Sequence, residues 1–183
     1  MKFFLILLFT IISMNQLHSQ DSLKKPLTVV PSVDIKRYCG TWYEIARLPN
    51  RFQKECAGFV SATYTLLENG DIEVVNKCRN NEGEMTEAVG KARIKDKNGP
   101  NTKLEVRFAP AILSFLPFVW GNYWIIDLAP DYSYAVIGEP NREYLWILSR
   151  SPQMDDATYR EILYRITEQG YDVSRLVRTK QAD

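Results

Sequence analysis

The sequence predicts an all-β domain of eight antiparallel strands, followed by one α-helix near the C-terminus. Three observations indicate this class. Short apolar segments follow one another with turn residues between them, their side chains alternate between apolar and polar, and no crossover helix lies among them. Strands at this spacing form an antiparallel sandwich or a closed barrel rather than a parallel α/β sheet. A chain of 183 residues has the length of one domain.

The N-terminus is expected to be a signal peptide covering residues 1–19. Lys2 gives a basic start, residues 3–14 form an apolar run shorter than the about 20 residues of a spanning helix, and Ser19 is a small residue suited to cleavage. An uncleaved anchor is the alternative. No Cys stands at the boundary, so the mature N-terminus is not expected to carry lipid. A polar leader, residues 20–33, then precedes the domain at 34–183.

The strands are punctuated by recognisable turns. Asn69 and Gly70 join the clearest hairpin, because Asn-Gly favours the tight turn between antiparallel strands. Another turn is expected at residues 98–100, and Pro-Asp and Pro-Asn-Arg sequences separate the later strands. The predicted strands are residues 40–48, 57–67, 71–79, 84–96, 102–109, 123–128, 134–138 and 144–150.

The exception to this pattern is an amphipathic helix at residues 155–169. Its apolar residues follow helical spacing, which indicates a packing face. Asp155 or Asp156 can cap its start, and Gly170 stands where a helix would end. The stripe consists of Tyr159, Ile162, Leu163 and Ile166. A short last strand at residues 176–180 is expected to follow.

Composition excludes several functions. Cleavage after Ser19 would remove Lys2, leaving 22 basic and 22 acidic residues, and would remove His18, the one histidine. A neutral protein has no global field for nucleic acid. Without histidine, Ser-His-Asp and Cys-His nucleophiles and His-based metal sites are excluded. We therefore expect no cofactor, no metal and no catalytic residue, although carboxylates such as Glu44 can serve as an acid or base.

The strand faces suggest a hollow interior. In the third strand Ile72, Val74, Asn76 and Cys78 share one face, and in the fifth strand Leu104, Val106 and Phe108 oppose Glu105 and Arg107. The inward face of the fourth strand consists of small residues, namely Ala88, Gly90 and Ala92. Small side chains leave room for a ligand inside an eight-stranded barrel, or else neighbouring strands fill that room.

The first strand begins Gly40-Thr41-Trp42, and here the sequence resembles the lipocalins. Residues 129–132 stand where their second signature lies, and residues 144–150 resemble the third, which ends on Arg150. The resemblance covers residues 34–180 and is strongest to bacterial lipocalins, plant temperature-induced lipocalins and apolipoprotein D. It implies an eight-stranded up-and-down barrel with the helix packed outside.

The up-and-down topology places Trp42 and Arg150 at the same end of the barrel, because successive strands alternate in direction. A guanidinium stacked on an indole contributes about 0.5–2 kcal/mol. The resemblance implies that this pair closes the base of the barrel. Gly40, Trp42 and Arg150 are therefore assigned a structural role.

The loop at residues 109–122 lies at the other end and carries no charge. It is rich in large apolar residues, and such a surface usually marks an interaction. Three interpretations compete: a flap over the pocket, a membrane-docking loop and a homodimer contact. In similar lipocalins an apolar loop here is linked to membrane association. The docking residues would be Phe115, Leu116, Phe118 and Trp120.

Family resemblance and strand parity agree on several ligand-lining positions. Most supply an apolar wall and a few supply polar groups, which suits a ligand with one polar end and a long apolar body. Fatty acids and lysophospholipids fit this description. No inward Lys or Arg is evident, and Arg47 is a candidate for contacting a carboxylate. The predicted ligand-binding residues are Tyr64, Asn76, Phe108, Tyr123 and Trp146.

The cysteines indicate an oxidising compartment. Cys56 and Cys78 fall at the open rim of one hairpin, and export permits a disulfide between them. An ideal Asn-Gly register pairs Cys78 with Ser61, so the bridge requires a bulge or a curled chain. Cys39 is expected to be a free, buried thiol.

We expect a non-enzymatic lipid carrier or store serving membrane maintenance or stress response. The alternatives are a lipocalin-fold enzyme acting on a lipid-like substrate, and a structural or adhesion protein with a solid barrel. Export implies the periplasm or the exterior, with peripheral contact to a membrane such as the outer membrane. No nucleic-acid partner is expected.

Overall fold

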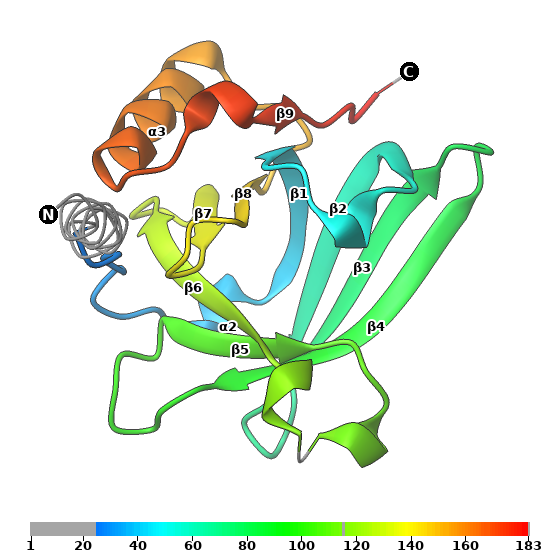
Figure 1. The fold of residues 1–183 in the computed structure, drawn as a ribbon, viewed down its shortest axis with the longest axis vertical. Coiled ribbons are helices and arrows are strands. Elements are labelled where there is room, and N and C mark those ends of the chain that lie inside the picture. The colour runs from blue at the N-terminus through cyan, green and yellow to red at the C-terminus, as the bar shows by residue number, and fades with distance from the viewer. Residues whose placement is uncertain (1–24, 115, 183) are drawn as a thin grey trace, which may run out of the picture.

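In the computed structural model, which describes residues 25–114 and 116–182, antiparallel strands form one sheet that closes into a barrel (Figure 1). The predicted signal peptide lies outside the described residues. The eight barrel strands are β1 (Gly40–Arg47), β2 (Cys56–Leu66), β3 (Ile72–Asn80), β4 (Met85–Ile94), β5 (Lys103–Arg107), β6 (Gly121–Leu128), β7 (Tyr134–Gly138) and β8 (Leu145–Ser149). A short helix α2 (Ile35–Tyr38) precedes them, and helix α3 (Asp156–Glu168) and strand β9 (Val177–Arg178) follow.

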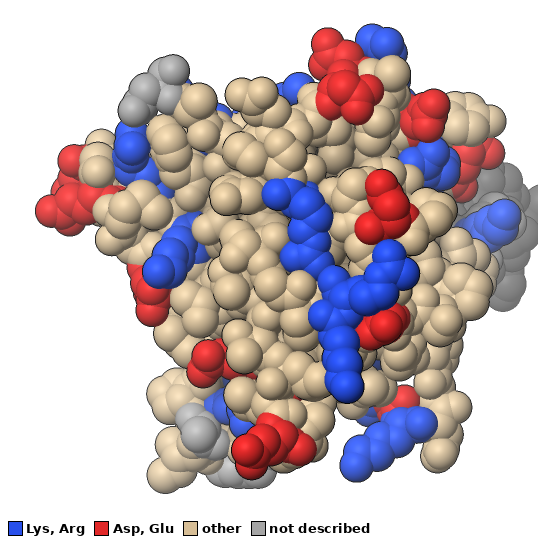
Figure 2. Space-filling model, turned by 180° about the vertical axis from the view of Figure 1, so that it is seen from behind, with Lys and Arg blue, Asp and Glu red and all other residues tan. Residues whose placement is uncertain are grey.

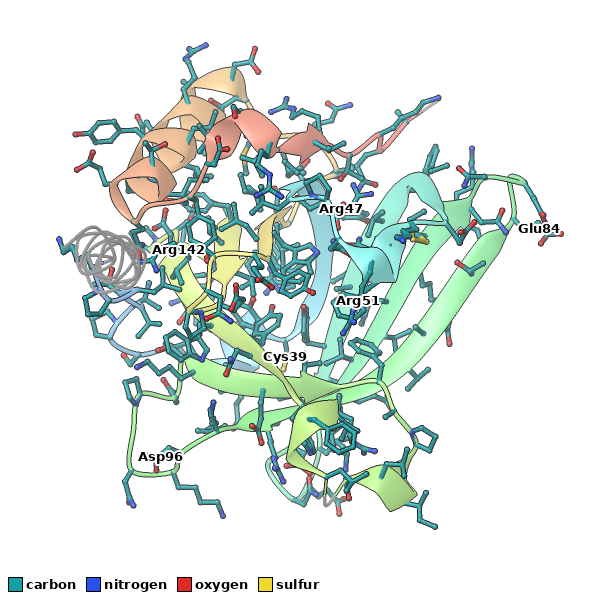
Figure 3. The ribbon with its side chains drawn as sticks, viewed as in Figure 1. Cys39, Arg47, Arg51, Glu84, Asp96 and Arg142 are labelled. Atoms are coloured by element: carbon teal, nitrogen blue, oxygen red, sulfur yellow. A yellow bond between two sulfur atoms is a disulfide. The ribbon has the colours of Figure 1, made fainter. Side chains whose placement is uncertain are left out.

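The sheet order is β2-β3-β4-β5-β6-β7-β8-β1-β9, with an additional β1–β2 pairing that closes the ring. Every strand pair is antiparallel, which confirms the up-and-down barrel. Figure 3 shows Glu84 at the β3–β4 turn and Asp96 at the β4–β5 turn, far apart on the molecule. Successive connections therefore alternate between two ends. We name the end holding the β1–β2, β3–β4, β5–β6 and β7–β8 connections the open end.

The C-terminal segment completes the barrel wall. β1 pairs with β2 only from Gly40 to Tyr43, and its second half pairs instead with β9. The Phe59 N–H donates to the Lys180 carbonyl at 2.6 Å, so the segment also bonds β2. Strand β9 therefore lies between β1 and β2 near the open end, and Figure 1 shows the chain running there from α3. The strand predicted at residues 176–180 is shorter in the structure, where β9 covers only Val177–Arg178. The residues after it remain hydrogen-bonded to β1 and β2, but they are not in a regular strand.

Helix α3 covers the outside of the barrel. Asp155 caps its start by accepting from the Thr158 N–H at 2.9 Å, and Gly170 follows it with φ of +84°, the left-handed conformation that ends helices. Ile162 and Ile166 are fully buried against the outward faces of β1, β6, β7 and β8. The predicted stripe is therefore a packing face. Among the described residues, no helix has the length and apolar character to cross a bilayer.

The β2–β3 hairpin confirms the Cys56–Cys78 disulfide. The expected pairing of Cys78 with Ser61 is wrong by one residue: Ser61 pairs with Lys77, because the turn spans three residues between Leu67 and Asp71. Two register shifts between Cys56 and Ser61 then bring the cysteines together. The expected irregularity in the ladder is therefore present, and it brings the two cysteines close enough to form the disulfide.

The prediction for the end of the fifth strand needs correction. β5 ends at Arg107, so Phe108 lies beyond the ladder and is 43% exposed. Arg107 is 6% exposed although its strand face points outward, because its guanidinium donates to the Ala109 carbonyl and lies 5.3 Å from the Trp120 ring. The loop that follows the strand therefore buries a charge that alternation assigns to solvent.

Candidate ligand-binding site

One end of the barrel is closed by side chains. The Arg150 guanidinium lies 3.8 Å from the centroid of the Trp42 ring, which is fully buried. Its two terminal nitrogens donate to four backbone carbonyls, those of Arg37, Tyr38, Cys39 and Thr41. Gly40 has φ of +96°, and a Cβ there would lie 3.3 Å from an Arg150 nitrogen. Arg150 thus joins the end of β8 to the start of β1 at this end of the barrel.

Above this base, three tyrosines form the floor of the interior. The Tyr38 and Tyr123 hydroxyls lie 2.7 Å apart, and Tyr123 donates to the Tyr64 hydroxyl at 2.9 Å. Because the one hydroxyl hydrogen of Tyr123 is used in the bond to Tyr64, Tyr38 must be the donor in its own bond to Tyr123. The hydroxyl hydrogen of Tyr64 then has no acceptor among the described residues. The floor offers one hydrogen-bond donor within an apolar setting.

Burial keeps these hydroxyls neutral. It raises the pKa of Tyr64 to about 12, and it raises the pKa of Tyr38 and of Tyr123 well above 10.0. The low dielectric disfavours a phenolate at all three positions. At Tyr38 and Tyr123 repulsion from a neighbouring tyrosine charge raises the pKa further, whereas at Tyr64 the hydrogen bond from Tyr123 lowers it in part. The floor therefore donates hydrogen bonds at physiological pH and carries no charge.

The walls above the floor are mainly apolar, and four of the five sequence-predicted ligand residues lie on them. Tyr64 is buried, Asn76, Tyr123 and Trp146 are half-buried, and Phe108 is exposed near the open end. Strand register places the first four on inward faces, because they pair with or alternate with core residues. A Cβ at Gly90 would meet the Phe108 ring at 2.6 Å, so this ring lies over the inward side of β4.

Part of the interior is open to solvent. Thr86 and Ala88 point inward, since they share a face with Gly90 and pair with Cys78 and Asn76, yet both are exposed. Residues of β4 before Lys91 have no β5 partner, because β5 ends early. Deeper inward residues such as Val74 and Leu104 are buried. The barrel is therefore packed at its floor and accessible along β4 toward the open end.

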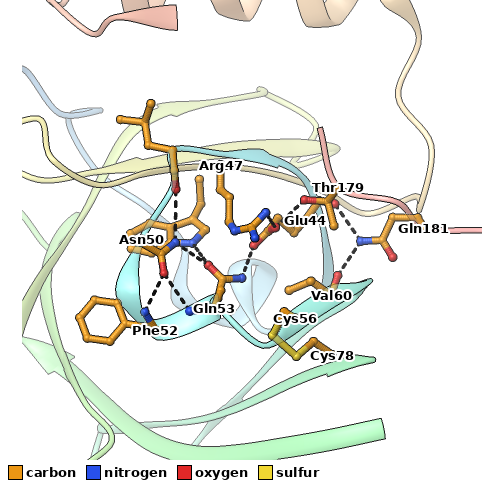
Figure 4. Close-up of polar contacts among 12 residues, drawn as sticks. Glu44, Arg47, Asn50, Phe52, Gln53, Cys56, Val60, Cys78, Thr179 and Gln181 are labelled. Carbon is orange, nitrogen blue, oxygen red and sulfur yellow. Dashed lines mark hydrogen bonds and ion pairs between the residues drawn. A yellow bond between two sulfur atoms is a disulfide. The ribbon is translucent and has the colours of Figure 1, made fainter. Parts of the chain in front are cut away.

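A polar cluster lies at the open end, on the inner side of β1 (Figure 4). The Glu44 carboxylate, only 2% exposed, accepts from Gln53 Nε2 at 2.6 Å and from the Thr179 hydroxyl. Arg47 Nη1 lies 3.5 Å from the Glu44 carboxylate. The Gln53 carbonyl oxygen accepts from Trp146 Nε1 at 2.8 Å. The cluster links β1, the β1–β2 connection, β8 and the C-terminal segment.

Simple alternation does not predict this cluster. Glu44 and Arg47 are three residues apart, which would place them on opposite faces of a regular strand. A register shift between Glu44 and Ala46 in the β1–β8 ladder brings both to the inner face. Two adjacent apolar residues, Ile45 and Ala46, stand between the charges and both pack under α3. That doublet is the signal in the sequence that could have indicated a bulge.

Electrostatics at Glu44 reflect its burial. Desolvation raises the pKa of the Glu44 carboxyl, and the hydrogen bonds from Thr179 and Gln53 and the nearby Arg47 charge oppose that shift. Hydrogen-bond donors already meet both carboxylate oxygens. The carboxylate is therefore held in place by the wall and is not presented to the interior as a free base.

The β5–β6 connection carries two short 3-10 turns, η3 (Ala111–Leu113) and η4 (Pro117–Val119). Ile112 and Phe118 are each 79% exposed, whereas Leu116 and Trp120 are half-buried. The Trp120 ring lies 4.0 Å from the Arg93 guanidinium. Phe115 lies outside the described residues. Two of the four predicted docking residues are thus partly covered, and Ile112 is an exposed residue that the prediction omitted.

The surface charge is mixed. The space-filling view in Figure 2 shows a band of basic side chains near the middle of one face, with acidic side chains beside it and a largely uncharged surround. The formal net charge of the whole chain is +1. This face shows no broad field of one sign that would attract a polyanion.

The closed antiparallel barrel, packed at one end and open at the other with a helix outside, defines the class of small barrels that enclose a ligand site. Residues 33–181 match the model of the lipocalin-like domain. The chain belongs to the lipocalin family.

Several relatives span most of this chain. Temperature-induced lipocalin-1 of Arabidopsis thaliana is 43% identical over 87% of this chain and 86% of its own. Outer membrane lipoprotein Blc of Escherichia coli is 40% identical over 89% and 88%. Apolipoprotein D of Mus musculus is 34% identical over 85% and 80%. These relatives confirm the resemblance and support a role in binding a hydrophobic ligand.

Solved structures share the fold at lower identity. Lobster apocrustacyanin A1 aligns with a TM-score of 0.64 and 18% identity, covering 87% of this chain and 94% of that one. Insecticyanin from the tobacco hornworm Manduca sexta aligns with a TM-score of 0.63 and 18% identity, covering 87% and 86%. At this identity the similarity concerns the architecture alone.

Proposed function

We propose that this protein binds one amphiphilic lipid, a fatty acid or a lysophospholipid, inside the barrel and carries or stores it without chemical change. One observation carries the proposal: inward-facing side chains on β4 remain exposed above a floor that is packed and neutral. An acyl chain fits an apolar wall of this kind, and Tyr64, Asn76, Phe108, Tyr123 and Trp146 are the residues proposed to line it.

The non-enzymatic role is part of this proposal. Glu44 is the carboxylate best suited by its burial to acid or base chemistry, but its oxygens are occupied by Gln53 and Thr179. The name of one relative, apolipoprotein D, further supports a lipid-related role. We propose service in membrane maintenance or stress response.

Filling the interior tests the proposal. Ala88→Trp places an indole on the inward face of β4, whereas Val89→Trp places one on the outward face, where Val89 is 54% exposed. Native mass spectrometry and lipid extraction of the purified protein should find a co-purified acyl lipid. Oleate should displace a fluorescent pocket dye from the wild type and Val89→Trp, and Ala88→Trp should bind neither.

Three results would contradict the proposal. A wild-type protein that binds none of the acyl lipids tested would favour the alternative of a structural protein whose barrel is filled by its own side chains. Retained binding by Ala88→Trp would place the lipid outside the barrel. Turnover of the bound lipid, seen as a changed mass after incubation, would instead favour an enzyme.

We also propose that the β5–β6 connection docks on membranes. Ile112 and Phe118 are apolar residues that are each 79% exposed, which suits insertion at the acyl boundary of a bilayer. In liposome flotation, Ile112→Ser/Phe118→Ser should lose binding. Met85→Ser/Val89→Ser, which removes two exposed apolar residues from β4, should keep it. Equal flotation of wild type and the loop variant would reject docking, and a change in sedimentation by that variant would indicate a homodimer contact.

We propose that residues 1–19 are a cleaved signal peptide and that the mature protein is exported, with peripheral contact to a membrane such as the outer membrane. The Cys56–Cys78 disulfide supports an oxidising compartment. Because no Cys stands at the proposed cleavage site, we expect the mature chain to lack N-terminal lipid. Intact mass and release by carbonate washing test both points.

A further inference from the structure

Arg47 occupies an unusual position for an arginine. It pairs with Trp146 across the β1–β8 ladder, and Trp146 packs against the barrel core, so the Arg47 side chain belongs to the inner face. Only 14% of that side chain is exposed. Figure 4 shows it beside Glu44 and Gln53, in the polar cluster at the open end.

The Arg47 guanidinium makes no hydrogen bond within the part of the chain that the structure describes. Its Nε is buried without a partner, and its one ionic contact is Nη1 to Glu44 at 3.5 Å, longer than a hydrogen bond. Arg150, by contrast, donates to four carbonyls. A buried N–H without an acceptor is costly, and a guanidinium that is mostly buried gains when an acceptor meets its remaining donors.

Glu44 does not meet this need. Its two carboxylate oxygens accept from Gln53 and Thr179, which hold it away from close contact with the guanidinium. The terminal nitrogens of Arg47 are not among the fully buried atoms without a partner, so ligand oxygens can reach them, and two such donors match two oxygens of a carboxylate or a phosphate. An oxyanion is the acceptor whose charge and geometry suit these donors.

We propose that Arg47 binds the anionic group of the lipid, a carboxylate or a phosphate, at the open end of the barrel, with the acyl chain extending toward the tyrosine floor. This inference rests on the proposed function and adds the polarity and orientation of the ligand. Arg47 then selects anionic amphiphiles over neutral ones of the same chain length.

The test compares three probes that share one acyl chain: oleate, oleoyl lysophosphatidic acid and oleyl alcohol. Affinity is measured by displacement of a pocket dye from wild type, Arg47→Met, Arg47→Lys and Arg51→Met. Arg51 is the matched control, since it is an exposed arginine on the same β1–β2 connection. Circular dichroism and melting temperature establish that each variant folds.

Arg47→Met should weaken at least one anionic probe about tenfold or more, the effect of losing hydrogen bonds to a charged group, and leave oleyl alcohol unchanged. The probe that weakens more identifies the group, carboxylate or phosphate. Arg47→Lys should restore part of the loss, and Arg51→Met should change none of the three affinities. Glu44→Gln, which removes the neighbouring negative charge, should tighten binding of the anionic probe.

An equal loss for oleyl alcohol, or no loss for either anion, would overturn the role of Arg47 while leaving lipid binding intact. A wild type that prefers the alcohol, or a Glu44→Gln variant that binds the anions more weakly, would overturn that role as well. A wild type that binds none of the three probes would overturn the proposed function itself.

Discussion

At the scale of single residues, Arg150 has the most concentrated set of interactions among the charged side chains described. Stacking on Trp42 and donation to four carbonyls tie the segment before β1 to the end of β8. Without Arg150, these backbone carbonyls would need water as their hydrogen-bond donor. The geometry explains why a guanidinium rather than an ammonium occupies this position, since one planar group reaches several acceptors at once.

Arg150→Met should therefore lower the free energy of unfolding by about 2–4 kcal/mol, through lost charged hydrogen bonds and lost stacking. Arg150→Lys should restore only part of it. Urea denaturation measures both, with Arg160→Met on the exposed side of α3 as the control. A loss no larger than that of the control would show that the base closes without this residue.

The three buried tyrosines make the folded protein less stable at strongly alkaline pH. Burial raises the pKa of Tyr64 from 10.0 to about 12, so the folded protein holds this proton more tightly than the unfolded chain does. The stabilisation is complete below pH 10 and is lost as pH rises through 12. Thermal melts across this window should show falling stability, and Tyr64→Phe should make the fall less steep. A slope unchanged by the substitution would contradict this account.

At the scale of elements, strand β9 and the residues after it form part of the barrel wall between β1 and β2. Gln181 Nε2 donates to the carbonyls of Glu44 and Val60 at 2.8 and 2.7 Å, bridging the gap between β1 and β2. Two strands that diverge toward the open end would otherwise leave backbone groups unpaired. The segment also brings Thr179 to Glu44, so it supports the polar cluster.

Gly58 allows this insertion. A Cβ at Gly58 would lie 2.6 Å from the Lys180 carbonyl oxygen, so Gly58→Ala should displace the C-terminal segment and destabilise the protein by about 1–3 kcal/mol. Gly121→Ala is the control, because its Cβ would meet its nearest neighbour at an ordinary 3.8 Å. Hydrogen exchange should show new opening at residues 44–47 and 58–60 in the Gly58 variant alone. Equal protection in both variants would argue against the wall role.

At the scale of the whole molecule, the barrel divides into a stabilising half and an accessible half. Core side chains fill the floor, and a second cluster lies between the barrel and α3. The inward face of β4 toward the open end contributes little to either cluster. Ligand binding there should add stability that the empty protein lacks.

A lipid at a hundred times its Kd should raise the free energy of unfolding by about 2.7 kcal/mol, provided that it binds only the folded state. Differential scanning calorimetry with and without oleate measures the shift, and Ala88→Trp should show none. A shift of equal size in that variant would mean that oleate stabilises the protein from outside the barrel.

The order and type of the elements could be predicted from the sequence because they depend on local signals. Alternation identified the strands to within a few residues, Asn69-Gly70 located the hairpin, and helical spacing located α3. The three signatures then identified the family. These features need only near neighbours in the chain, or a pattern shared with relatives.

The position of side chains at strand ends and bulges depended on contacts between distant segments. Arg47 and Glu44 share the inner face because β1 shifts its register against β8, and Arg107 is buried because the next loop folds over it. The last residues form wall because the space between β1 and β2 admits them. A local pattern specifies which residues alternate, but the register of a ladder is a balance among all the strands it joins, and that balance exists only in the folded barrel.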